Sequence, residues 1–526
     1  MIARRTLLAA SATLALTPGV ALGQSVSKVE VTAAMKRATR FMVEKLAYRG
    51  GYVWSYLPDR SRIWGELEAY KTMVWVQPPG TATMGHLYLD AYHATGDEYY
   101  YQAAAQAAGA LIAGQLPQGG WNYFIDFGGP ESTKRWYETI GRNAWRMEEF
   151  QHHWGNATFD DGGTGEAIRF LIRIYVEKRE KRFKPGLDKA IDFIFASQLE
   201  NGGWPQRWPR VADGGLHGKP DYTGLITFND GVIHDNIDVL LTYHQAIGDP
   251  RIPPAIRRGM DIYLSTQQPA PQAGWGLQHT MDLKPAGARS YEPKALVTHT
   301  TASNIEQLMT FYRLTGDDRY LAPVPAALDW LESVRLPADS QVGGRQFPTF
   351  VEIGTNRPLF VHRRGSNVVN GEYYADYDPA HTIGHYNARR GIDTAKLRRE
   401  YEKLKAMPGK AAAKDSPLLK GRQPLKKYWM AEVEPGSDMN ATKGGKDAKS
   451  LVGSLNAEGW WPTQLRAMSH PYSGPGSKTV ARGDFRSTHV GDVTDTSPFD
   501  MENGPVGIST GTYIDHMITL IKALQT

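Results

Sequence analysis

The sequence predicts a mainly α-helical protein, an α/α toroid built from helical hairpin repeats with a loop- or β-rich excursion. A phrase that ends in Gly-Gly-Trp recurs, with copies ending at Trp121, Trp204, Trp275 and, in decayed form, Arg345. The spacings of 83, 71 and 70 residues suit two helices with their loops. Stacked hairpins form either an open solenoid or a closed toroid. We favour a complete or partial toroid, because polar motifs gather just before the second, third and fourth inner helices and would converge on one mouth.

Each predicted hairpin pairs an inner helix with an outer one. The inner helices are apolar nearly all round and are expected at 84–92, 167–175, 233–241 and 305–312. The outer helices are amphipathic: Leu187, Ala190 and Ile194 recur at helical spacing, and Asn201-Gly202-Gly203 ends that helix. Helices at 31–46 and 512–524 would complete the set.

Two stretches fall outside the repeat. Residues 47–83 are rich in aromatic residues, Gly and Pro, which predicts a rim or a β-rich loop. Residues 396–450 are rich in Lys and Arg, and we interpret them as a solvated excursion or linker rather than a binding patch. We therefore divide the chain into a signal peptide (1–23), a catalytic domain (24–395) and an excursion with an irregular region and a closing helix (396–526).

The N-terminal leader indicates an exported protein, secreted or periplasmic. Arg4-Arg5 precede an apolar run and Ala21-Leu22-Gly23, which is typical of a signal peptide with a twin-arginine-like start. The general secretory route fits equally well. No other stretch is apolar enough to suggest a membrane span.

Composition excludes several classes of function. The chain has no cysteine, so disulfides, a thiolate nucleophile and a cysteine zinc site are excluded. The formal net charge of +5 is too mild for nucleic acid but allows a local cationic cleft for an acidic polysaccharide. We expect a monomer.

Three aspartates precede inner helices and are the strongest candidates for chemistry. Asp160 and Asp161 stand before the second inner helix, and Asp230 stands before the third. Such carboxylates could bind a hard cation such as Ca²⁺, with substrate oxygens completing the shell. They could equally be the acid and base of a hydrolase, or simply cap the helices that follow. Spacing alone leaves these alternatives open.

Cations and aromatic residues accompany these aspartates. Arg289 and Arg357 could grip a carboxylate with their planar forks. Alternatively they pair structurally with Glu292 and Glu352 in the same motifs. Three tryptophans could stack on sugar rings or plug the core: Trp204, Trp208 and Trp275.

Five motifs together resemble family 10 of the polysaccharide lyases, the pectate lyases. They are T-F-D-D (158–161), N-G-G-W-P-Q-R-W-P (201–209), I-T-F-N-D (226–230), K-P-A-G-A-R-S-Y-E-P (284–293) and G-T-N-R-P (354–358). The resemblance runs in order from about residue 105 to 365. It implies an α/α toroid that cleaves polygalacturonate by calcium-assisted anti-β-elimination.

The resemblance also implies roles for individual residues. Arg289 corresponds to the family's Brønsted base, and Asp160 and Asp230 correspond to its calcium and carboxylate site. We extend the predicted metal site to Asp161, where the family usually has Asn. The predicted substrate-binding residues are Arg207, Asn229, Lys284 and Arg357.

The sequence therefore predicts a calcium-dependent, pectate lyase-like enzyme that acts on an acidic polysaccharide. Two rivals stay open. One is a glycoside hydrolase on the same toroid that uses Asp160 or Asp161 with Asp230. The other is a non-catalytic uronan-binding protein that kept the cleft and lost turnover.

Overall fold

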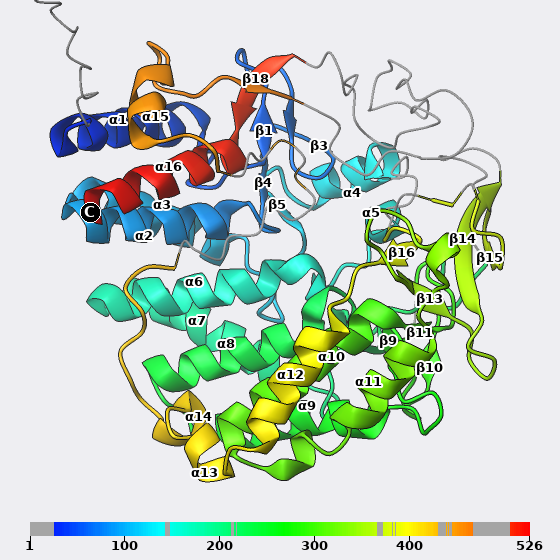
Figure 1. Ribbon diagram of the computed structural model, residues 1–526. Coiled ribbons are helices and arrows are strands. Elements are labelled where there is room, and N and C mark those ends of the chain that lie inside the picture. The colour runs from blue at the N-terminus through cyan, green and yellow to red at the C-terminus, as the bar shows by residue number, and fades with distance from the viewer. Residues whose placement is uncertain are drawn as a thin grey trace, which may run out of the picture.

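The computed structural model describes residues 26–141, 148–211, 215–216, 218–364, 372–380, 382–383, 386–429, 438, 440, 444–465 and 505–525. In these residues the chain forms helical hairpins, with short strands gathered near one end of the helices (Figure 1). The predicted leader lies outside the described residues. No helix among the described residues is long and apolar enough to cross a membrane.

The described helices form an inner row and an outer row, as the repeat predicts. The inner helices are α16 (Thr510–Gln525), α2 (Thr81–Thr95), α6 (Gly163–Lys178), α8 (Val232–Ala246) and α10 (Thr298–Thr315). The outer helices are α1 (Lys28–Phe41), α3 (Glu98–Ala113), α7 (Lys184–Ser197), α9 (Ile252–Thr266) and α11 (Val324–Ser333). Helices α16, α2, α6 and α8 pack side by side in that order, and each inner helix packs against its outer partner. The architecture is the α/α toroid that the sequence predicts.

The first hairpin joins the two ends of the described chain. Helix α16 packs against both α1 and α2 and so serves as the inner partner of α1. This confirms that the two terminal helices complete the set.

Shorter helices decorate this frame. They are α4 (Pro130–Thr139), α5 (Glu148–Gln151), α12 (Thr394–Lys405), α13 (Gly409–Ala412), α14 (Pro417–Lys420) and α15 (Ala448–Ser454). Single turns are η1 (Met42–Leu46), η3 (Asp160–Gly162), η4 (Lys181–Phe183), η5 (Asn229–Gly231), η6 (Asp318–Tyr320) and η7 (Ala338–Ser340). Helices α12, α13 and α14 pack on α10, and α14 also contacts α8. Residues 394–420 are therefore packed on the helical toroid and are not a solvated linker. The sequence interpretation missed the buried stripe of Leu397, Tyr401 and Leu404, which follows helical spacing in α12.

The described strands are short and pair antiparallel. The N-terminal group is β1 (Ser55–Tyr56), β2 (Ile63–Trp64), β3 (Glu68–Ala69), β4 (Met73–Trp75), β5 (Phe124–Asp126), β6 (Ala157–Thr158), β7 (Arg207–Trp208) and β8 (Ile226–Thr227). The C-terminal group is β9 (Gln278–His279), β10 (Pro285–Ala286), β11 (Leu296–Val297), β12 (Phe347–Pro348), β13 (Phe350–Val351), β14 (Pro358–Arg364), β15 (Glu372–Asp376), β16 (Arg389–Arg390), β17 (Thr463–Gln464) and β18 (Val506–Ser509).

These strands form one mouth of the toroid. Strands β6, β8, β11 and β18 directly precede the inner helices α6, α8, α10 and α16. All the described strands together form six small sheets, with the strand orders β17-β18-β1-β2-β3, β10-β9-β8, β11-β13-β14-β15, β12-β16, β4-β5 and β6-β7. The β-rich rim predicted for 47–83 is confirmed by β1 to β4.

The repeated tryptophans are core plugs. In three copies the indole Nε1 donates to a carbonyl of the preceding helix: Trp121 to Leu111, Trp204 to Ile194, and Trp275 to Tyr263, at 2.8–3.0 Å. All three side chains are fully buried, so they do not stack on ligands. Trp208 is half-buried in β7.

One further copy escaped the sequence comparison. Trp461 donates to the carbonyl of Leu451 at 3.0 Å, ten residues back, as Trp204 does. Gly459 has φ +98°, against +97° at Gly202. Only one glycine precedes the Trp460-Trp461 pair, which hid the match. Helix α15 is thus part of the repeated array and packs on α1 and α16.

Candidate active site

Two turns of the same shape open the inner helices α6 and α8. In the first, Thr158 donates its backbone N–H to Trp121, and in the second Thr227 donates to Trp204. Asp161 and Asp230 then take φ/ψ of 50°/24° and 49°/24°, followed by Gly162 and Gly231 at φ 67° and 70°. Asp160 and Asn229 therefore occupy equivalent positions in the two turns, and so do Asp161 and Asp230. The two turns η3 and η5 pack against each other.

This geometry shows that the capping interpretation was wrong. Helices α6 and α8 begin after Gly162 and Gly231, and neither has a side-chain cap. Asp161 and Asp230 occupy the left-handed region instead, which Asp and Asn tolerate better than most residues. Non-glycine residues held there cluster at functional sites.

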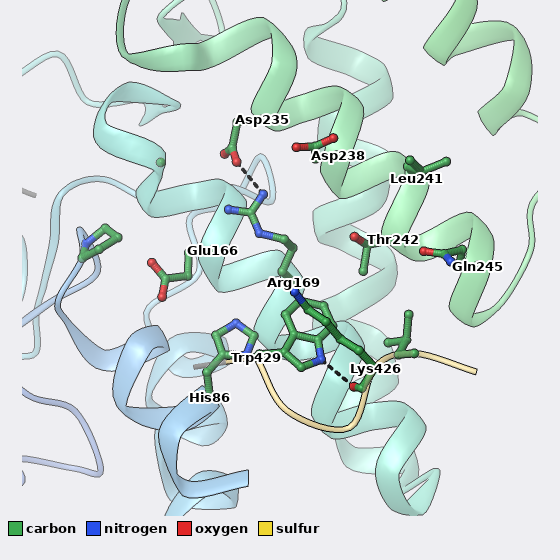
Figure 2. A pocket seen from close by; sticks show the side chains of 13 residues that line it. His86, Glu166, Arg169, Asp235, Asp238, Leu241, Thr242, Gln245, Lys426 and Trp429 are labelled. Atoms are coloured by element: carbon green, nitrogen blue, oxygen red, sulfur yellow. Dashed lines mark hydrogen bonds and ion pairs between the residues drawn. The ribbon is translucent and has the colours of Figure 1, made fainter. Parts of the chain in front are cut away.

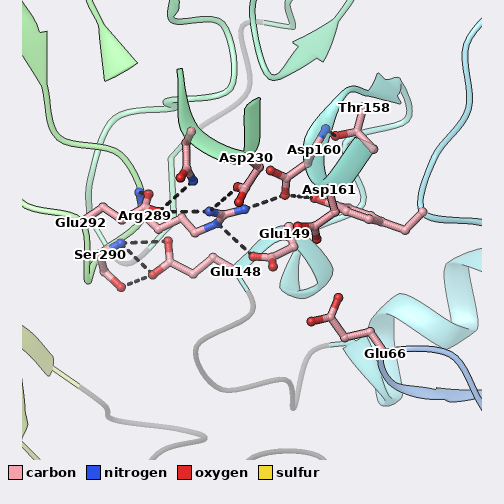
Figure 3. Close-up of polar contacts among 12 residues, drawn as sticks. Glu66, Glu148, Glu149, Thr158, Asp160, Asp161, Asp230, Arg289, Ser290 and Glu292 are labelled. Carbon is pink, nitrogen blue, oxygen red and sulfur yellow. Dashed lines mark hydrogen bonds and ion pairs between the residues drawn. The ribbon is translucent and has the colours of Figure 1, made fainter. Parts of the chain in front are cut away.

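Arg289 joins the two turns at the centre of a buried cluster. Its Nη2 donates to Asp160 Oδ2 at 2.6 Å, and its Nε donates to Glu149 Oε2 at 3.1 Å (Figure 3). Its Nη1 donates to Glu292 Oε1 at 3.0 Å and lies 3.8 Å from Asp230 Oδ2. The side chain is 4% exposed. The predicted pairing of Arg289 with Glu292 is confirmed, and the same arginine also reaches both aspartate turns.

The loop that carries Arg289 is tied down at its base. Glu292 accepts the Arg289 backbone N–H at 2.9 Å. Glu148 of α5 accepts the Ser290 N–H at 2.9 Å and also its hydroxyl. Glu148 and Glu149 therefore hold Arg289 and Ser290 from the opposite wall. Sequence reasoning missed both glutamates, since they lie in no repeat copy and in none of the quoted motifs.

The charges of Arg289 and Asp160 depend on each other. Burial alone would lower the pKa of Arg289, but Asp160 and Glu149 outweigh it and raise the pKa well above its ordinary value. Burial would raise the pKa of Asp160, yet Arg289 holds it below its usual range. In this arrangement Arg289 is a cation and Asp160 an anion.

The other carboxyls resist ionisation. Burial, followed by the charge of Asp160, raises the pKa of Asp161 and Asp230 well above the usual range. Burial raises the pKa of Glu148 and of Glu149 to about 7. Among the described residues, the cluster therefore holds more carboxyl groups than Arg289 alone can balance.

Tyrosines form the wall behind the cluster. The Tyr123 hydroxyl donates to Asp160 Oδ2 at 2.6 Å. The Tyr386 hydroxyl accepts from Asn229 Nδ2 at 2.9 Å and donates to Glu292. Tyr222 is buried with its ring 6.0 Å from the Arg289 guanidinium carbon. No motif marked these tyrosines in advance.

Two of the four predicted substrate-binding residues lie at or behind the cluster. Asn229 belongs to it through Glu292 and Tyr386. Arg207 is 1% exposed and lies one layer back, 5.2 Å from the Tyr123 ring, with Nη1 at 3.4 Å from Asn156 Oδ1.

The other two lie on exposed hairpin turns. Lys284 is 72% exposed beside Asp282 between β9 and β10. Arg357 is exposed at the start of β14, over the Tyr377 ring at 3.3 Å. No contact among the described residues joins either of them to Arg289. Their predicted roles stay predictions.

The residues present suit a hard cation that substrate helps to hold. Asp160 Oδ1 is buried and accepts no hydrogen bond from any of the described residues. Carboxylate oxygens are the donors that Ca²⁺ prefers. In the described part of the chain, no group of three or more His, Asp or Glu side chains is arranged to hold a metal ion without further ligands. Asp160, Asp161 and Asp230 could therefore supply part of a calcium shell, with the remaining oxygens coming from substrate and water.

The sequence matches one known family over this region. The family model described as pectic acid lyase matches residues 131–378, which include all the motifs quoted above. The comparison with curated proteins found no match.

Solved structures with weak overall similarity include several carbohydrate-active enzymes. A mutant of a family 10 polysaccharide lyase from Cellvibrio cellulosa in complex with trigalaturonic acid is 19% identical, with a TM-score of 0.39, covering 61% of this chain and 98% of its own. The α-1,6-mannanase of Salegentibacter sp. HEL1_6 is 11% identical, with a TM-score of 0.36, covering 95% of this chain and 100% of its own. A cellobiose 2-epimerase from Spirochaeta thermophila DSM 6192 is 12% identical, with a TM-score of 0.34, covering 72% of this chain and 96% of its own.

Proposed function

We propose, from the match of residues 131–378 to the pectic acid lyase family model and from the geometry around Arg289, that the protein cleaves polygalacturonate or a related acidic polysaccharide by calcium-assisted β-elimination. The proposal includes an exported protein that meets its polymer outside the cytoplasm.

One observation carries the proposal: Arg289 lies within reach of both aspartate turns in a cluster crowded with carboxyl groups. It contacts Asp160, Glu149 and Glu292 and lies 3.8 Å from Asp230. Asp161 and Asp230 have raised pKa values, so they hold protons that a bound divalent cation would displace. This charge balance and the family match support the calcium part of the proposal.

The reaction makes two demands on the site. Removing the C5 proton of a uronate develops enolate charge on the adjacent carboxylate. A divalent cation held by Asp160, Asp161 and Asp230, calcium in our proposal, would supply the charge that stabilises this enolate. Arg289 accepts the C5 proton, the C4–O4 bond breaks, and C4=C5 forms. The leaving oxygen takes a proton from solvent.

A base must be neutral before it can accept a proton, and here the neighbouring carboxylates keep Arg289 charged. Asp160 and Glu149 are the main groups that raise its pKa. Neutralising Asp160 and Asp230 would remove part of that attraction and leave burial, which lowers the pKa. The order of binding is therefore part of the proposal: Arg289 becomes basic only after the aspartates are neutralised.

The test follows ultraviolet absorbance during incubation with polygalacturonate, with calcium or with a chelator. The conjugated C4=C5 product should appear with calcium and disappear with the chelator. Arg289→Lys keeps the positive charge that the carboxylates need but moves the nitrogen atoms, so turnover should fall by about 10²–10⁴-fold. Arg251→Lys, at an arginine that is 56% exposed, is the matched control and should keep full activity. Absence of the unsaturated product with every uronan would reject the proposal.

A specific observation favours hydrolysis as the second candidate. Adjacent carboxyls with pKa values pushed apart are a sign of acid and base partners. The pKa of Asp160 is lowered, whereas that of Asp161 and Asp230 is raised. New reducing ends without any unsaturated product, and no response to the chelator, would select the hydrolase.

A further inference from the structure

A cavity opens on the inner wall of the toroid. It has a volume of about 610 Å³ and lies between α2, α6 and α8 and the chain segment 425–429 (Figure 2). Its lining includes Glu166, Arg169, Asp235 and Trp429. Gly162, which follows Asp161, borders the cavity and links it to the aspartate turns. The volume is typical of small-molecule sites, about 300–1,000 Å³.

The inner helices carry a polar stripe along this cavity. Glu166 and Arg169 of α6, and Asp235, Asp238 and Thr242 of α8, follow helical spacing. The same helices bury their other faces in the core. An amphipathic helix normally turns its polar face to the outside of a fold. The Arg169–Asp235 ion pair joins α6 to α8, and the other polar side chains of the stripe line the cavity instead of the core, which indicates a ligand.

Trp429 is fixed in the cavity wall from several sides. Its backbone N–H donates to Asp90 Oδ2 at 3.1 Å, and its ring stacks on His86 at 5.2 Å with 15° between the planes. Its Nε1 donates to the Lys426 carbonyl at 2.9 Å. Residues 425–429 lie outside the family segment 131–378. The C-terminal part of this chain therefore supplies an ordered aromatic residue to the cavity.

The charges along the cavity offset one another. Arg169 and Asp235 form an ion pair in Figure 2. Lys426 is the second cation of the lining, and it stands against Asp238 and Glu166, of which Glu166 has its pKa raised by burial to about 7. A uronate carboxylate or an ammonium group would upset this balance and be buried without a partner, which costs free energy. Carboxylates, the Thr242 hydroxyl and the Gln245 amide instead offer donors and acceptors that match sugar hydroxyls.

We propose that this cavity binds a neutral sugar residue of the substrate, so that the polymer is an acidic heteropolysaccharide in which neutral sugars accompany the uronate at the cleaved bond. This inference rests on the proposed function, because it takes the aspartate turns beside Gly162 as the uronate site. The cavity then selects for a neutral backbone unit or branch that polygalacturonate lacks.

Isothermal titration calorimetry on the full-length protein with calcium tests the inference. The probes are the neutral disaccharides galactobiose, mannobiose, cellobiose and xylobiose, with digalacturonate for comparison. At least one neutral disaccharide should bind. Glu166→Gln, which keeps the shape of the side chain, and Trp429→Ala should each weaken that binding about tenfold or more and leave digalacturonate binding unchanged. Trp460→Ala, at a tryptophan stacked on Phe41 instead, is the matched control and should change neither.

Three outcomes would overturn the inference: no neutral disaccharide binds, the Glu166→Gln affinity equals that of the wild type, or digalacturonate binding falls in parallel. A single cooperative thermal unfolding transition for Glu166→Gln shows that the variant is folded. The variant Arg289→Lys tests the lyase proposal independently of this inference, because it should lose turnover and still bind the neutral disaccharide. Unsaturated product without disaccharide binding rejects the inference alone, whereas disaccharide binding without unsaturated product rejects the lyase alone.

Discussion

The turns 158–162 and 227–231 share one backbone and differ in chemistry at one inward position. Asp161 and Asp230 superpose in conformation within about a degree. At the preceding position the first turn has Asp160, fully buried against Arg289 and Tyr123. The second turn has Asn229, which donates to Glu292 and Tyr386. The repeat thus supplies a turn that points one side chain inward and holds the next in a left-handed conformation. The first turn has Asp at the inward position and accepts a hydrogen bond from Arg289, whereas the second turn has Asn there and donates to Glu292 and Tyr386.

Making the first turn like the second should have the largest effect. Asp160→Asn removes the anion that Arg289 holds, so we expect activity on uronan to fall by about 10²–10⁴-fold. Breaking a buried ion pair should also cost about 3–5 kcal/mol of unfolding free energy at neutral pH. Because Arg289 lowers the pKa of Asp160, this contribution is present above the unfolded pKa and is lost as pH falls through the lowered value. Urea unfolding at neutral and acid pH should show the gap closing; a constant gap would contradict the argument.

The reciprocal change, Asn229→Asp, should have a smaller effect. It replaces an amide donor by a carboxylate 3.3 Å from Glu292 Oε1, so the two acceptors repel each other. We expect about 1–3 kcal/mol less stability at neutral pH, with recovery as the pH falls and the carboxyls take up protons. Denaturant unfolding measures both. Asn229→Ser, which adds no charge, is the control and should show no such recovery.

Asp161 and Asp230, the two aspartates in the left-handed conformation, should contribute differently to calcium affinity. Asp161 accepts from Gln77 Nε2 at 2.7 Å, whereas Asp230 faces Arg289. Asn tolerates the left-handed conformation, so Asp161→Asn and Asp230→Asn should both fold. We expect Asp230→Asn to weaken calcium affinity about tenfold and Asp161→Asn to weaken it less, since Asn is usual at that position in the resembling family. Titration calorimetry with calcium measures this, and equal losses would show that the two turns are equivalent.

The smallest effect concerns the next equivalent pair, Glu166 on α6 and Asp235 on α8. Asp235 is paired with Arg169, whereas burial raises the pKa of Glu166 from 4.5 to about 7. A raised carboxyl pKa means that the folded state holds the proton more tightly. Its contribution is therefore full below pH 4.5 and is lost as pH rises through about 7. The melting temperature of the wild type should fall between pH 5 and pH 8 by about 2 °C more than that of Glu166→Gln, because the variant lacks the titrating carboxyl group. An unchanged difference between the two pH values would refute this.

Helix periodicity and the Gly-Gly-Trp phrase predicted the hairpins correctly, since both record local geometry. These patterns could not tell a tryptophan buried in the core from one that stacks on a sugar ring. Trp204 and Trp275 proved to be buried, and their indole N–H groups donate to carbonyls near helix ends. The copy at Trp461 was missed because a tryptophan replaces its second glycine.

The site itself depends on contacts that periodicity does not encode. Arg289 and Asp160 stand 129 residues apart and meet because consecutive hairpins share a mouth, and the family motifs were needed to single them out. Glu148, Glu149 and Tyr386 carry no motif, so the sequence did not single them out. Lys284 and Arg357 lie in motifs but on exposed hairpin turns, where sequence proximity to Arg289 or Glu352 does not bring them into the cluster.

Helix α16 gives the chain an unusual order of assembly. It lies between α1 and α2, so the first hairpin of the array lacks its inner member until residues 510–525 have been synthesised. Closing a contact across nearly the whole chain is slow, because the entropy of the long intervening segment is lost first. Ribosome-bound chains should therefore hold the middle hairpins before the ends, and a stop codon just before Thr510 should leave a species prone to aggregation rather than a shortened enzyme.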